Sequence, residues 1–100
     1  MSEAVPNHKH VVITDENGKV DKDEIELWRG TGEHVVWSAS VTKGFRVVFD
    51  GPEGSPFESA AFEVPAGGVV HSGEPKKGGR YKYTVHGPSG INDPIIIIKP

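Results

Sequence analysis

The side chains best suited to chemistry in this 100-residue chain are its five histidines, because the chain contains no cysteine. Three imidazoles around an open coordination position make a typical zinc or copper site. His71 lies near the start of a glycine-rich loop, His86 follows a tyrosine-rich strand, and His34 begins an apolar run. If these loop ends converge at one end of the fold, the three histidines bind one divalent ion. The alternative is that they are ordinary surface or hydrogen-bonded histidines.

Two further histidines, His8 and His10, belong to the sequence N-H-K-H near the N-terminus. In an extended segment, residues two apart lie on the same face, so this pair can chelate a divalent ion weakly. The alternative is a hydrated terminus in which they have no role. We expect residues 1–9 to form a flexible segment and residues 10–100 to form a single domain.

Motifs for nucleophilic, calcium or phosphate chemistry are absent from the sequence. The serine of Gly87-Pro88-Ser89-Gly90 lacks the spacing of a nucleophile elbow. The acidic residues between Asp15 and Glu24 lack the twelve-position register of an EF-hand, and no glycine-rich phosphate loop is present. We therefore expect a protein that is not an enzyme and needs no cofactor.

Charge and hydropathy limit the partners. The formal net charge is −3 and the isoelectric point is about 5.9, whereas a general nucleic-acid-binding protein has a basic face. The longest apolar run is Ile95–Ile98, which is far too short to span a bilayer, and the N-terminus does not resemble a signal peptide. We expect no nucleic-acid partner, no membrane partner and a cytoplasmic location.

The elements that must position these side chains are β-strands. The chain has 13 glycines and 8 prolines, 21 of its 100 residues, and they separate short runs rich in valine, isoleucine and aromatic residues. This pattern is typical of an all-β sandwich or barrel, here with about seven short strands. The glycine-containing turn at 29–33 predicts a hairpin between the strands on either side. The expected strands cover 10–14, 24–29, 34–38, 45–50, 69–72, 80–86 and 94–99, and 59–64 is ambiguous between a strand and a helical turn.

The hydrophobic core is expected to come from the apolar and aromatic residues of these strands. Each fully buried side chain of this kind contributes about 1.5–3 kcal/mol, so a dozen of them provide a credible driving force for one domain. The predicted core residues are Val12, Ile25, Leu27, Val35, Trp37, Val47, Phe49, Phe62, Tyr81, Tyr83, Val85, Ile95 and Ile97.

Three sequence motifs follow one another in an order that is found in a known β-sandwich fold. A strand ending in V-V-W-S at 35–38 is followed by F-R-V-V-F-D at 45–50, then by a loop rich in proline, glycine and serine. The glycine-led strand G-R-Y-K-Y-T-V at 79–85, a short loop and a closing strand complete the chain. This order resembles the cupredoxin fold, the Greek-key β-sandwich of the small blue copper proteins, over roughly Ile25 to Lys99.

The resemblance does not extend to the copper ligands. The family takes one histidine from the start of the F-R-V-V-F-D-like strand, and a cysteine, a histidine and a methionine from around the final loop. Those positions correspond here to Phe45, Val85 and Pro88 or a neighbour, and Met1 is the only methionine. The resemblance therefore implies a cupredoxin-like domain that lacks the blue-copper ligand set.

Two function classes follow from these observations. The first is a non-enzymatic structural or interaction module, with self-association through Trp28 or the C-terminal strand as one form. Trp28 alternates out of phase with Ile25 and Leu27, so it is a candidate interface residue; the alternative is that it covers the sandwich edge. The second class is a divalent-metal-binding domain that uses the histidines at one end of the sandwich.

Overall fold

The computed structural model describes residues 8–40 and 42–100. Ten strands and no helix lie in these ranges, so nothing in this part of the chain forms a helix able to cross a membrane. The expected flexible segment at 1–9 lies largely outside the described residues, and the first strand begins at His8. The strands are β1 (His8–Ile13), β2 (Glu24–Trp28), β3 (His34–Ala39), β4 (Phe45–Val48), β5 (Ala61–Val64), β6 (Val69–His71), β7 (Gly79–Lys82), β8 (Thr84–His86), β9 (Ile91–Asn92) and β10 (Ile95–Lys99).

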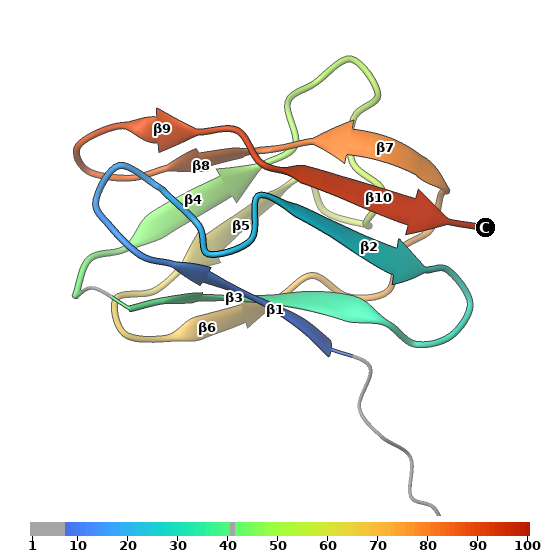
Figure 1. Cartoon of the computed structure of the whole chain (residues 1–100), viewed down its shortest axis with the longest axis horizontal. Coiled ribbons are helices and arrows are strands. Elements are labelled where there is room, and N and C mark those ends of the chain that lie inside the picture. The colour runs from blue at the N-terminus through green and yellow to red at the C-terminus, as the bar shows by residue number, and fades with distance from the viewer. Residues whose placement is uncertain (1–7, 41) are drawn as a thin grey trace, which may run out of the picture.

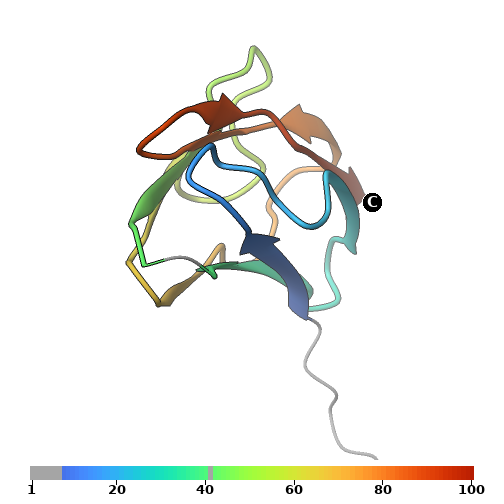
Figure 2. The ribbon, with the colours of Figure 1, turned by 60° about the vertical axis from the view of Figure 1, so that its left-hand side comes forward.

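The strands form two layers around one core, as the sequence predicts for an all-β sandwich (Figures 1 and 2). One layer is the sheet β1-β3-β6, in which β1 pairs with β3 in parallel. The other layer contains the sheets β2-β10-β7 and β5-β4-β8-β9. In Figure 1 the β1-β3-β6 sheet lies along the bottom of the molecule and β7 to β10 lie along the top.

The run expected as one strand at 80–86 is divided at Tyr83 into β7 and β8. β7 pairs with β10, whereas β8 pairs with β4, so the chain changes sheets at this point. The amide of Tyr83 donates to the carbonyl of Pro94 at 3.0 Å and so leaves both ladders. This division, together with the two-residue strand β9, is why the structure has ten strands where about seven were expected.

The hairpin predicted around residues 29–33 is wrong. β2 pairs with β10 in parallel, and β3 pairs with β1 and β6, so the turn carries the chain from one layer to the other. Two amides at the start of this turn are hydrogen-bonded: that of Trp28 donates to Glu33 Oε1 at 2.7 Å within the turn, and that of Arg29 donates to the Lys99 carbonyl of β10 at 2.9 Å. A glycine-containing turn between two apolar strands does not by itself specify which strands will pair.

Two predicted core positions in the last strand and one in the first have the wrong phase. Ile96 and Ile98 face the core, and Ile95 and Ile97 are only half-buried. Similarly, Val12 is half-buried between Val11 and Ile13, which are both fully buried. Both runs are apolar without alternation, so the phase is set by pairing: Ile96 lies level with Ile25, and Ile98 with Leu27.

The centre of the core is a cluster of aromatic rings around the fully buried Trp37. The ring centroids of Phe62 and Tyr83 lie 5.2 and 5.6 Å from that of Trp37, and Phe49 and Phe57 complete the cluster. These tilted and edge-on arrangements are the ones that aromatic quadrupoles favour. The remaining predicted core residues, from Ile25 to Val85, are buried as expected.

Candidate functional site

His34 and His71 are brought together on the β1-β3-β6 sheet. His34 begins β3, His71 ends β6, and the two strands are antiparallel neighbours. His34 Nε2 lies 3.1 Å from His71 Nδ1, and the ring centroids are 5.3 Å apart. Two nitrogens at this separation are linked by one hydrogen bond, and the same pair can instead direct both lone pairs at one cation.

The orientation of the His34 ring is fixed by its second nitrogen. Nδ1 of His34 lies 3.2 Å from the carbonyl oxygen of Gly32, which can only accept a hydrogen bond. Nδ1 therefore carries the proton, and Nε2, on the side of His71, offers its lone pair. A backbone carbonyl that orients an imidazole in this way is the usual outer-shell partner of a metal-ligating histidine.

His86 does not join this pair. It lies on β8 in the opposite layer, is exposed, and is level with Arg46 of β4. Across the described ranges, no three or more His, Cys, Asp or Glu side chains are arranged to hold a metal ion. The three histidines proposed from the sequence are therefore divided between the two layers, with His34 and His71 in one and His86 in the other.

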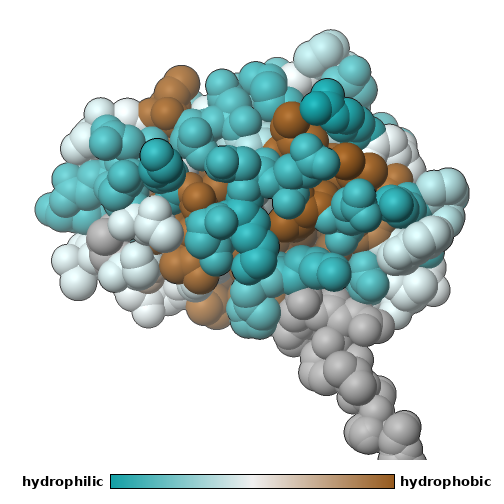
Figure 3. Space-filling model, viewed as in Figure 1, coloured by the Kyte–Doolittle hydropathy of each residue, from teal (hydrophilic) through white to brown (hydrophobic). Residues whose placement is uncertain are grey.

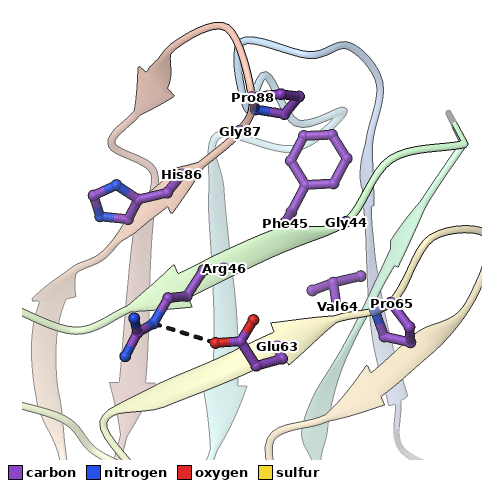
Figure 4. Close-up of a pocket in the computed structure, with 9 residues that line it drawn as sticks. All are labelled: Gly44, Phe45, Arg46, Glu63, Val64, Pro65, His86, Gly87 and Pro88. Carbon is purple, nitrogen blue, oxygen red and sulfur yellow. Dashed lines mark ion pairs between the residues drawn. The ribbon is translucent and has the colours of Figure 1, made fainter.

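His86 instead lines a surface pocket of about 550 Å³ at the end of the sandwich where Phe45 meets residues 85–90 (Figure 4). We call this region the loop end. The pocket is mainly apolar, with Phe45, Val64 and Pro88 in its wall, and the Arg46–Glu63 ion pair at 3.4 Å forms one side. Figure 4 shows His86 projecting from the same strand that continues into Gly87 and Pro88.

The loop end is where the resemblance places the copper ligands, and the side chains at the three ligand positions are hydrocarbons. Phe45 and Val85 are buried, at 3% and 0% exposure, and Pro88 lines the pocket beside them. None of the three side chains carries an atom that coordinates a metal. The residues present at these positions therefore do not fit a copper ion bound by a thiolate and two imidazoles.

A turn from the first quarter of the chain packs against the loop end from behind. The amide of Ser89 donates to the carbonyl of Glu16 at 2.9 Å, and a Cβ on Gly87 would meet that carbonyl and lie 2.9 Å from Phe45 Cε2. Gly18, at a φ of +81°, similarly lies against the carbonyl of Val85. The acidic turn that superficially resembles a calcium loop is thus a structural support for residues 85–90.

Trp28, the candidate interaction residue, is 50% exposed at the end of β2, an edge strand of its sheet. Lys99 Nζ lies 5.5 Å from the centroid of the indole ring, within the range of a cation–π contact. The same ammonium group pairs with Glu26 at 3.3 Å. Trp28 therefore does not cover the sandwich edge completely, and it lies beside charges of both signs.

The position of the H-K-H segment relative to His34 and His71 was not predicted from the sequence. The expected terminal segment at 1–9 included His8 and the expected strand at 10–14 began at His10, whereas both histidines belong to β1, the neighbour of β3. The signal that was available is that H-K-H runs without interruption into the apolar residues at 11–13, so the strand could have been extended backwards.

Comparison with known proteins identifies the fold. No protein-family model and no curated protein sequence matches the chain. Among solved structures, a purple cupredoxin from Nitrosopumilus maritimus is similar at a TM-score of 0.66 and 15% identity, over 90% of this chain and 98% of that one. A Cu(I) structure of an amicyanin mutant gives 0.65 and 17%, over 97% and 87%. Reduced auracyanin from Roseiflexus castenholzii gives 0.57 and 16%, over 97% and 100%.

These similarities define a Greek-key β-sandwich of the cupredoxin type, as the resemblance in the sequence implied. They extend over nearly the whole of each chain. At identities of 15–17% they describe the fold alone. What the chain does has to be argued from its own side chains.

Proposed function

We propose that this chain is a non-enzymatic domain of cupredoxin fold that lacks a blue copper centre and binds a divalent transition-metal ion through His34 and His71. The observation that carries the proposal is the 3.1 Å separation between His34 Nε2 and His71 Nδ1. Two nitrogens bound to the same ion at roughly 2.0–2.1 Å are about 3 Å apart, so little movement is needed to exchange the shared proton for a metal.

The ligand type indicates which ions to expect. Imidazole suits zinc, copper and nickel, whereas calcium and magnesium prefer oxygen ligands. Without a cysteine in the chain, a site built on these histidines cannot supply the thiolate of a blue copper centre. The hydrocarbon side chains of Phe45 and Val85 likewise support the absence of a blue copper centre at the loop end.

The test is isothermal titration calorimetry of the full chain with Zn²⁺, Ni²⁺ and Cu²⁺. We expect His71→Ala to weaken binding by at least about tenfold, because it removes a ligand and not merely an outer-shell partner. His86→Ala is the matched control, since it removes an exposed histidine of the opposite layer. Binding should also release protons and weaken on acidification, because protons and metal compete for the same nitrogens. Equal losses in the two variants, or no binding to the unmodified chain, would contradict the proposal.

A second candidate function, favoured by the exposure of Trp28, is self-association. Tryptophan is enriched among the residues that dominate binding energy, and an interface between identical copies requires a self-complementary patch. Trp28 lies beside the Lys99–Glu26 ion pair. The patch therefore carries a positive and a negative charge, as a self-complementary surface requires. Figure 3 shows further apolar side chains between hydrophilic ones over β2 and β10.

Sedimentation velocity over a wide concentration range tests this second candidate. We expect a dimer that is lost in Trp28→Ala and retained in Val69→Ala, a matched control because Val69 is a similarly exposed apolar residue on the other layer. A monomer at all concentrations of the unmodified chain would rule out self-association. Loss of the dimer in both variants would assign it to general surface hydrophobicity and not to Trp28.

A further inference from the structure

We propose that the H-K-H segment of β1 completes the metal site, so that the bound ion fastens this edge strand to β3 and β6. The inference rests on the proposed function, because it concerns the same ion held by His34 and His71. It adds the source of the further ligands and a structural consequence of binding.

Strand pairing places four histidine positions close together on one sheet. His8 is level with His34 across the β1–β3 pair, and His10 is level with Val36. Val36 is in turn level with His71 across the β3–β6 pair. With strands about 4.8 Å apart and a rise of about 3.3 Å per residue, these positions fall within roughly 10 by 7 Å.

The positions also share a face, which we call the histidine face and define by residues 10, 34, 36 and 71. Val11 and Trp37 lie level with each other and are both fully buried in the core. Because side chains alternate along a strand, the residues next to them in the sequence, at positions 10 and 36, lie on the outer surface of the same sheet. His10 and His71 are both exposed there.

The floor of the histidine face is apolar. Val36 lies between His10 and His71 in the pairing, and it is only 3% exposed although it does not belong to the core cluster. A hydrophobic residue beneath imidazole ligands limits the access of water and favours the metal–nitrogen bonds over hydration. An outward-facing valine that is buried in this way is consistent with side chains gathering above it.

A third ligand from β1 would attach this strand to β3 and β6 through the metal ion. β1 is an edge strand of its sheet, in which it pairs in parallel with β3. Its other side is bonded to the segment that follows it in the chain: the amide of Val12 donates to Asp21 Oδ1 at 2.9 Å, and Lys22 Nζ donates to the His10 carbonyl at 2.8 Å. Since His10, His34 and His71 are not already assembled as three donors, a His10 ligand has to turn towards the ion when the ion binds. Metal binding is then coupled to the ordering of β1, as it is in other sites whose ligands come from separate segments.

The experiment uses the full chain with Zn²⁺ and two readouts. Calorimetry should show that the double variant His8→Ala/His10→Ala binds at least about tenfold more weakly than the unmodified chain, with His86→Ala unchanged. Hydrogen exchange should show that Zn²⁺ slows exchange of the β1 amides in the unmodified chain and not in the double variant. The single variants His8→Ala and His10→Ala then assign the ligand, and circular dichroism without metal checks that each variant is folded.

The outcomes separate the two proposals. Loss of affinity in His34→Ala together with full affinity in the double variant would overturn the role of β1 and leave the proposed function intact. Absence of binding to the unmodified chain would overturn both. Weaker binding in the double variant without any change in β1 exchange would overturn the fastening of the strand.

Discussion

Tyr83 is a titratable residue inside the hydrophobic core. Its side chain is fully buried, and its hydroxyl accepts a hydrogen bond from Trp37 Nε1 at 3.3 Å. Burial raises the pKa of Tyr83 well above the ordinary value for tyrosine, and the hydrogen bond from Trp37 offsets this only in part. The phenol therefore stays neutral in the folded protein at a pH where the unfolded chain has begun to ionise.

This difference predicts a specific loss of stability in alkali. Below the unfolded pKa near 10, the contribution of Tyr83 to folding is fully present; it is lost as the pH rises towards the higher folded pKa. We expect the free energy of unfolding to fall above pH 10 by up to about 1.4 kcal/mol per pH unit on account of this residue. Urea denaturation at a series of pH values from roughly 9 to 11 measures it.

Tyr83→Phe is the matched variant for that measurement. It keeps the ring and removes the titrating hydroxyl, so the dependence on pH should become shallower. At neutral pH it should cost about 1–3 kcal/mol, because Trp37 Nε1 is left buried without its acceptor. The explanation fails if the unmodified protein and the variant lose stability with the same slope.

At the scale of elements, the last strand shows how pairing settles what a local pattern leaves open. Four consecutive isoleucines carry no alternation, so either pair of them could face the core. In the structure, β10 lies between β2 and β7, and Ile96 is level with both Ile25 and Tyr81. All three are buried, so the register joins apolar side chains from three strands in one row.

Substitutions along β10 test this phase. Ile96→Ala should cost about 2–5 kcal/mol, because it empties a fully buried site. Ile97→Ala removes the same atoms from a half-buried position of the same strand, and we expect well under half of that cost. Chemical denaturation of both variants gives the comparison. A larger loss for Ile97→Ala would mean that the strand has the opposite phase.

For the whole molecule, the fold is that of the cupredoxins, and the proposed metal site lies on a different surface from the loop end where the resemblance places the copper ligands. At the loop end, Phe45 and Val85 occupy the ligand positions, and the turn at 15–18 packs behind them. His34 and His71 lie on the outside of the β1-β3-β6 layer. A domain can keep its core and topology while its chemistry changes, because the core and the exposed faces use alternate residues of the same strands.

Metal binding at this site should therefore stabilise the whole domain by mass action. A ligand at about a hundred times its dissociation constant adds about 2.7 kcal/mol to the free energy of unfolding if it binds only the folded state. For a domain of about 100 residues, this corresponds to a rise in Tm of roughly 10–20 °C. Differential scanning calorimetry with Zn²⁺ should show the rise in the unmodified chain.

The control for that rise is the variant His34→Ala/His71→Ala, which should show little or none. An equal rise in this variant would place the stabilising ion elsewhere. A Tm that is unchanged by Zn²⁺, Ni²⁺ and Cu²⁺ in the unmodified chain would contradict the metal-binding proposal as a whole.

For the candidate site, the sequence predicts which residues are available as ligands but not which of them lie together. The absence of cysteine made histidine the available ligand, and His34, His71 and the H-K-H segment could each be selected by residue type. Which of them meet depends on strand partners that are far apart in the chain: β6 lies beside β3, and β1 on its other side. His86 belongs to the opposite layer, and no local pattern distinguishes it from His71.

The sequence by itself determined that the chain is an all-β sandwich and that it offers no thiolate ligand. Alternating apolar residues, dense glycine and proline, and the presence or absence of a residue type are local properties, so they can be read without knowing the fold. Only the tertiary structure decided the phase of the isoleucine run, the division of the strand at Tyr83 and the meeting of His34 with His71. Each of these depends on contacts between residues that are distant in the chain. The energy of such a contact depends on both partners, so the sequence of one segment does not determine it.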